Sequence, residues 1–188
     1  MAPSVFEERM TKVVFSNGAD RWFVSQLYRS TSAAILRSVR VLRFVGLQWE
    51  GRDWTMLNVA LRCCERLEEL VLSRMSTLKN GNLEAIVQVL PETMQILNLE
   101  NCQLLGALPV LTNIPRLETL LLPGCTALSR VPDTGWGKLK RLKKIDLFAC
   151  ELIGQDDIDG IIHLLSADQF DQLLLIMPNG QVKVEKNL

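Results

Sequence analysis

The chain has 188 residues, of which 48% are hydrophobic and 22% are charged, and its 21 basic residues balance its 21 acidic residues. This length and apolar content predict one folded domain with a sizeable core and exclude a disordered chain. The zero net charge argues against a general nucleic-acid binder. No apolar run approaches the roughly 18 to 20 residues that span a bilayer, so no transmembrane segment is expected.

The N-terminal part, residues 1–38, is predicted to form a cap at one end of the fold. A short strand is expected at Lys12–Phe15, followed by an apolar helix within Asp20–Ser38. Residues 2–12 lack the apolar region of a secretory signal. Residues 21–49 carry five arginines and no acidic residue. This composition is typical either of a transit peptide or of a basic face on a folded helix, and both interpretations stay open.

A short apolar pattern recurs along most of the chain. In each copy an apolar residue, counted as position one, is followed by apolar residues at positions four and six. The best copies begin at Leu67, Met94, Leu117 and Leu142, weaker ones at Val39 and Phe170, and a further candidate at Met10. Successive copies are therefore 23 to 29 residues apart. Such a repeat predicts short strands that stack and bury their apolar residues against one another.

Three of the units share a cysteine at position nine, namely Cys102, Cys125 and Cys150. A small side chain at this position is expected to turn inward, where a thiol can satisfy backbone groups of a neighbouring turn. We therefore predict buried structural thiols and no disulfides at these three positions.

The units LEELVLSRM, MQILNLENC, LETLLLPGC and LKKIDLFAC resemble the leucine-rich repeat, L-x-x-L-x-L-x-x-N/C-x-L, in its cysteine-containing or ribonuclease-inhibitor-like subclass. The resemblance implies a curved α/β solenoid over residues 39–178. A parallel sheet would line its concave face, and helices and extended segments would cover its convex face.

The connections between strands are expected to differ. Apolar spacing predicts helices within Asp53–Cys64, Gly81–Leu90 and Gln155–Ser166. The 23-residue unit is too short for such a helix, and its glycine and prolines predict an extended or 3₁₀ connection. Residues 179–188 are predicted to form a C-terminal cap, in which residues 181–185 fold back antiparallel after an Asn-Gly turn.

Signals for catalysis are sparse, and we predict no enzyme activity, cofactor, metal or small-molecule substrate. The sole histidine, His163, is expected on the exposed side of a helix. Adjacent Cys63 and Cys64 are expected to pack in or beside the core, with a metal or redox role as the alternative. The acidic residues within Gln155–Gly160 suit a helix N-terminus better than a calcium loop.

Two surfaces could bind a partner. Positions three, five and seven should face away from the interior, and several are apolar, which indicates a protein-binding patch unless the register is misread or a terminal segment covers it. Its predicted members are Val71, Ile96, Asn98, Leu121, Phe148 and Leu174. The second surface is a basic run, which could be a solvated turn or a docking patch for an acidic protein, RNA or anionic lipid. Its members are Lys138, Lys140, Arg141, Lys143 and Lys144.

These features together predict a non-catalytic protein–protein interaction module, such as a small scaffold, adaptor or accessory subunit that binds protein through its concave face. One alternative is substrate recognition for a ubiquitin ligase. Another is binding of RNA or an anionic membrane surface through residues 138–144, although nucleic acid is not the expected partner. We expect an intracellular protein, in the cytoplasm first and in mitochondria or another organelle as the alternative.

Overall fold

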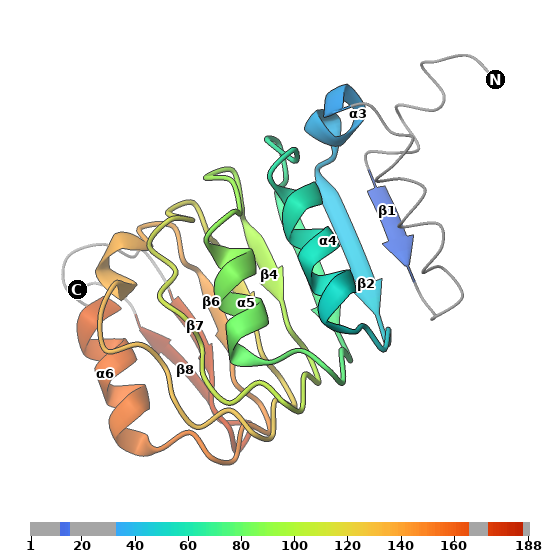
Figure 1. Ribbon diagram of the computed structural model, residues 1–188. Coiled ribbons are helices and arrows are strands. Elements are labelled where there is room, and N and C mark those ends of the chain that lie inside the picture. The colour runs from blue at the N-terminus through green and yellow to red at the C-terminus, as the bar shows by residue number, and fades with distance from the viewer. Residues whose placement is uncertain (1–11, 16–32, 166–172, 186–188) are drawn as a thin grey trace.

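The computed structural model describes residues 12–15, 33–165 and 173–185. Within them, eight strands form one sheet, and their order in the sheet is their order in the sequence (Figure 1). They are β1 (Lys12–Phe15), β2 (Val41–Val45), β3 (Glu69–Ser73), β4 (Ile96–Asn98), β5 (Thr119–Leu121), β6 (Lys144–Asp146), β7 (Leu173–Ile176) and β8 (Val182–Glu185). Strands β1 to β7 are parallel, and β8 is antiparallel to β7. The α/β class and the antiparallel return of residues 181–185 are thus confirmed.

Helices connect several of the strands. They are α3 (Ala33–Ser38), α4 (Gly51–Leu61), α5 (Asn80–Val87) and α6 (Gln155–Leu165), and a 3₁₀ helix, η2, spans Trp136–Lys138. Helices α4, α5 and α6 lie on one side of the sheet (Figure 1). They confirm the three helices predicted between strands, with ends that differ by a few residues. Of the helix predicted within Asp20–Ser38, the part before Ala33 lies outside the described residues.

The three longer connecting helices begin in the same way. The side chains of Asp53, Asn82 and Asp157 each accept a hydrogen bond from the backbone N–H three residues earlier, at 2.9, 3.1 and 3.2 Å. Each bond satisfies a backbone donor just outside the first helical turn. In addition, the positive end of the helix dipole stabilises the negatively charged carboxylates of Asp53 and Asp157. This accounts for the acidic start of α6.

The two units between α5 and η2 use extended backbone where other units use a helix. Ala107 and Arg130 form an isolated parallel bridge on this stretch. Near the end of this stretch, the Pro132 carbonyl accepts a hydrogen bond from the Trp136 indole N–H at 2.8 Å. The extended connection predicted for the 23-residue unit is therefore confirmed.

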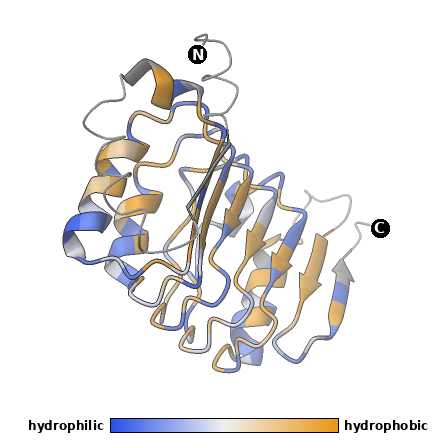
Figure 2. Cartoon of the chain, turned by 90° about the vertical axis from the view of Figure 1, so that its right-hand side faces the viewer, coloured by the Kyte–Doolittle hydropathy of each residue, from blue (hydrophilic) through white to orange (hydrophobic). Residues whose placement is uncertain are grey.

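The core lies between the sheet and the helices. Burial alternates along β2 and β4 to β7. In the units of β2 and β4 to β6 the residues at positions four and six are buried and the residue between them is partly exposed, and in β7 Leu173 and Leu175 are buried. The buried side of α4, formed by Trp54, Leu57 and Leu61, joins the same hydrophobic cluster as Leu42 and Leu70. Figure 2 shows orange running along the strands and blue on the outer turns of the helices. One face of the sheet is thus covered by helices; we call the other the open face.

Each parallel strand from β2 to β6 is followed by a residue in the left-handed region, at position eight of its unit. These residues are Gly46, Arg74, Asn101, Gly124 and Ala149, with φ between 55° and 73°. The N–H of each donates to a carbonyl of the next unit at 2.7 to 3.0 Å. The turn that ends one strand therefore also ties that unit to the next.

The three cysteines at position nine form a ladder beneath these turns. The thiols of Cys102, Cys125 and Cys150 donate to the carbonyls of Leu72, Leu99 and Leu122, one unit earlier, at 2.9, 3.1 and 3.0 Å. All three are fully buried and in no disulfide. Burial raises their thiol pKa values to about 11, 12 and 11, respectively. The prediction of buried structural thiols is confirmed.

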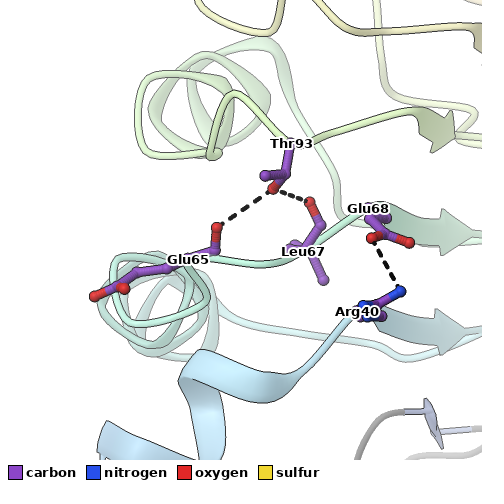
Figure 3. Close-up of polar contacts among 5 residues, drawn as sticks. All are labelled: Arg40, Glu65, Leu67, Glu68 and Thr93. Carbon is purple, nitrogen blue, oxygen red and sulfur yellow. Dashed lines mark hydrogen bonds and ion pairs between the residues drawn. The ribbon is translucent and has the colours of Figure 1, made fainter.

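Side chains also link the units where the strands begin (Figure 3). The Thr93 hydroxyl donates to the Leu67 carbonyl at 2.7 Å and approaches the Glu65 carbonyl at 3.4 Å, and Arg40 pairs with Glu68 at 3.4 Å. These contacts join units that follow one another in the sequence.

Candidate interaction surface on the open face

The open face presents positions three, five and seven of each unit. The strand register places position five in one row across the sheet, formed by Arg43, Val71, Asn98, Leu121, Asp146 and Ile176. Leu174 was predicted to belong to this row, but it aligns with Lys144 at position three. The prediction was wrong by two residues, because the last unit is longer than its apolar spacing indicated. Leu174 nevertheless keeps its predicted face, since a shift of two residues preserves the side of a strand.

The half of the open face over β2 to β4 is mostly polar. Arg43 pairs with Glu69, with Nη2 and Nε at 2.6 and 2.9 Å from the carboxylate. Val71 lies between Arg43 and Asn98 in register and is only 8% exposed. Its predicted role as an accessible contact is therefore corrected, because little of Val71 is available to a partner.

The half over β5 to β8 presents several exposed apolar side chains, with the Lys144–Asp146 pair of β6 among them. Leu121, Leu174 and Ile176 are partly exposed, whereas Phe148 and Val182 are 52% and 58% exposed. These five residues lie on four neighbouring strands or directly after them, and we call them the apolar patch. Of the other predicted contacts, Ile96 and Asn98 are partly exposed on β4, next to the patch.

Two members of the apolar patch, Ile176 and Val182, were not predicted. They pair directly across β7 and β8. The signal was present, because the Asn-Gly turn fixes which residue of β8 faces which residue of β7. The ring of Phe148 also reaches this turn: a Cβ added at Gly180 would lie 3.4 Å from its Cε2 atom. The hairpin and β6 therefore form one continuous surface.

Across β4 to β7 the backbone explains where apolar residues occur at position five. In β4 and β6, Asn98 and Asp146 occupy it, and their side-chain oxygens accept the N–H of position seven at 2.9 and 3.1 Å. In β5 and β7 the residue at position five is Leu121 or Ile176, and position seven is a proline, Pro123 or Pro178. Proline has no N–H to satisfy. In β5 and β7, therefore, position five need not supply a side-chain oxygen as a hydrogen-bond acceptor and can carry an aliphatic side chain.

The predicted basic run does not form a single patch. Lys143 pairs with Glu118 at 2.6 Å, and Lys144 pairs with Asp146 on the open face at 3.6 Å. Lys138, Lys140 and Arg141 remain exposed where β6 begins, without an ion pair to the described residues. The run is therefore corrected to these three side chains. Arg116, also exposed and unpaired within the described part, occupies the place before β5 that Arg141 occupies before β6.

The reactive side chains singled out in the sequence lie apart from this surface. His163 is exposed on α6. Cys64 is buried, donates to the Ala60 carbonyl at 3.4 Å, and has a thiol pKa raised to about 12 by burial. Asp159, in the acidic run, accepts a hydrogen bond from the Gln155 amide. The described residues contain no group of three or more His, Cys, Asp or Glu side chains able to hold a metal ion.

The helix side holds a groove that sequence reasoning missed. Its volume is about 490 Å³, and it lies between α5 and the extended residues 107–113. The groove is present where the short unit has no helix to pack against α5. Its only charged lining residue is Glu84. The 23-residue spacing was the one sequence feature that pointed to this region. It predicted that the unit has no helix, but it did not predict the groove beside α5 that results.

The chain was compared with known proteins. No protein-family model matches it, and no curated protein is significantly similar to it. In the described parts of the chain, no helix is both long enough and apolar enough to cross a membrane.

Proposed function

We propose that the chain is a non-catalytic protein-recognition module of the leucine-rich-repeat type, a small scaffold, adaptor or accessory subunit that binds a protein through its open face. The recurring units support the repeat assignment. In successive units the position-eight residue adopts the same left-handed conformation, and three position-nine thiols bond in the same way to the preceding unit. In this proposal the units form a solenoid whose concave side is the open face.

The apolar patch is the observation on which the proposed function depends. Phe148 and Val182 are more than half exposed. Ile176 pairs with Val182, Leu174 lies two residues before Ile176 on β7, and Leu121 lies two strands away, across Asp146 of β6. A contiguous exposed apolar surface marks an interaction site, because covering it with a partner removes apolar area from water. Large apolar side chains surrounded by smaller contacts are also the usual source of binding energy in protein interfaces. Phe148 is the most exposed residue among the predicted contacts and is proposed as the central anchor.

An intracellular compartment, the cytoplasm first and an organelle second, suits the cysteines. All five are free, although four are buried and one is partly exposed. Free thiols in this number persist most readily where the cell keeps cysteines reduced.

A double substitution tests the proposal. Leu121→Asp with Phe148→Asp places charges in the apolar patch, and we expect unchanged folding with at least a tenfold loss of partner capture from native extract. Val59→Asp with Leu104→Asp is the matched control, because both residues are exposed, at 38% and 51%, and lie outside the patch. Equal capture by both variants and the unmodified chain would contradict the proposal. Ubiquitin-ligase subunits among the captured proteins would instead specify substrate recognition as its role.

A further inference from the structure

We propose that the partner presents an acidic, amphipathic segment, whose carboxylates bind four cations that precede β5 and β6 while its apolar side chains cover the apolar patch. The cations are those of Arg116, Lys138, Lys140 and Arg141, which we call the basic edge. This inference rests on the proposed function, because it specifies the chemistry of the partner that binds the same surface.

The basic edge carries charge that the described part of the chain does not neutralise. All four side chains belong to exposed residues, and none is in an ion pair with a described residue. Two carboxylates near them in the sequence have other partners: Glu118 pairs with Lys143 at 2.6 Å, and Asp146 pairs with Lys144 at 3.6 Å.

The basic edge and the apolar patch belong to the same units. Arg116 and Arg141 directly precede Leu117 and Leu142, the buried residues that begin the β5 and β6 units. The register between these units is fixed, since the N–H groups of Lys143 and Lys144 both donate to the Glu118 carbonyl. The two arginines therefore lie at equivalent places on neighbouring units.

The distance from edge to patch suits one secondary-structure element. Leu121 lies five residues beyond Arg116, and Phe148 lies seven residues beyond Arg141, so an extended chain separates the two pairs by at most about 17 and 24 Å. A helix of about 16 residues covers the longer length. One amphipathic helix of that length, acidic at one end and apolar along one side, is long enough to reach both surfaces at once.

The chemistry favours an acidic protein segment over a nucleic acid. Unpaired cations beside an apolar surface attract carboxylates and speed association, and they repel a basic partner. Single-stranded nucleic acid also needs exposed aromatic rings on which its bases stack. Among the members of the apolar patch only Phe148 is aromatic, and Trp136 within the basic segment is 2% exposed. An acidic protein segment uses both surfaces, whereas this single ring offers successive bases no row on which to stack.

The experiment uses the full chain as immobilised bait in native extract, with a carbodiimide that joins lysine amines directly to carboxylates. The edge variant is Lys138→Glu, Lys140→Glu and Arg141→Glu. Its control is Arg52→Glu, Arg62→Glu and Arg66→Glu, which makes the same change in charge at three exposed residues outside the basic edge. We expect a protein that the unmodified chain and the control capture, that the edge and patch variants both lose at least tenfold, and that is cross-linked from Lys138 or Lys140 to an acidic segment.

Other results separate the two proposals. Loss by the patch variant alone, or cross-links that avoid Lys138 and Lys140, would overturn the acidic partner and leave the interaction module standing. Capture that ribonuclease abolishes would also overturn it and would assign the edge to RNA. Unchanged capture by the patch variant would contradict the proposed function itself. A synthetic peptide of the cross-linked segment should lose at least tenfold in affinity when its Asp and Glu residues are replaced by Asn and Gln.

Discussion

The side-chain oxygen of Asn98 accepts a hydrogen bond from the backbone N–H of Glu100 at 2.9 Å. Asp146 makes the same contact with Phe148, whereas Leu121 in β5 and Ile176 in β7 are followed two residues later by Pro123 and Pro178. Across β4 to β7 the backbone donor at position seven and the side-chain acceptor at position five are thus present together or absent together. This pairing separates the strands of that half that present an aliphatic side chain at position five from those that present a polar one.

The pairing predicts a specific rescue. Asn98→Leu should lower the free energy of unfolding by about 1 to 3 kcal/mol, because the Glu100 N–H loses its acceptor. Adding Glu100→Pro removes that donor and reproduces the arrangement of Leu121 with Pro123, so the double variant should recover about 1 kcal/mol or more. Urea unfolding of the unmodified chain, Asn98→Leu, Glu100→Pro and the double variant measures the coupling energy between the two positions. Strictly additive losses would show that the hydrogen bond does not govern this position.

The cysteine ladder predicts a loss of stability at alkaline pH. The thiol pKa values of Cys64, Cys102, Cys125 and Cys150 rise from 9.0 to between about 11 and 12 in the folded protein. Below pH 9 the thiols are protonated in both states, and their full contribution is present. As pH rises further the unfolded chain loses protons first, so the free energy of unfolding should fall by up to about 1.4 kcal/mol per pH unit for each thiol.

Urea unfolding between pH 8 and pH 10.5 checks this slope. Replacing Cys102, Cys125 and Cys150 by serine removes three of the titrating groups but leaves a hydroxyl donor for each carbonyl. The triple variant should therefore show a shallower decline than the unmodified chain. An identical slope in both would assign the alkaline loss to other groups.

A single thiol also contributes through packing and hydrogen bonding. Cys125→Ala should lower the free energy of unfolding by about 1 to 3 kcal/mol, because it leaves a small cavity and removes the donor to the Leu99 carbonyl. Cys125→Ser keeps a donor and should cost less than the alanine variant. Thermal unfolding followed by circular dichroism gives the order, and a greater loss for serine would contradict the role of the hydrogen bond.

The left-handed residue at position eight predicts opposite effects at two sites. Ala149 has φ of 58°, so Ala149→Gly should raise the free energy of unfolding by up to about 1 kcal/mol. Gly124 has φ of 73°, and an added Cβ would lie 2.2 Å from Asn101 Oδ1. Gly124→Ala should therefore lower the same quantity by about 1 to 3 kcal/mol. Urea unfolding of both variants tests the sign at each site.

The sequence predicted the parts of the fold that depend on local pattern. Apolar spacing identified the strands and the connecting helices, and the Asn-Gly turn identified the β8 hairpin. The register of β7 was mispredicted because the observed alignment, with Leu175 and Met177 at positions four and six, puts the polar Gln172 at position one and so departs from the apolar pattern. Only the backbone bonds between β6 and β7 distinguish the two alignments.

The sequence predicted on which face of the sheet the candidate residues lie, but not how exposed their side chains are. Alternation along the strands placed Leu121 and Phe148 on the open face, as the structure has them. It could not show that Val71 is only 8% exposed, that Arg43 pairs with Glu69, or that Lys143 and Lys144 are held by carboxylates. Those facts depend on how the side chains are arranged on the folded sheet.

In this sheet, strands adjacent in space are also adjacent in sequence. No distant segment must arrive before a given strand can pair, so partial unfolding can spread inward from either end while the middle stays intact. Amide hydrogen exchange should accordingly be slowest in β3 to β5 and fastest toward the ends. The apolar patch extends into β8, the last strand, where intrinsic protection is weakest. A ligand on that patch would slow amide exchange across the C-terminal strands. Strands that open most easily in the free protein would then be among the best protected.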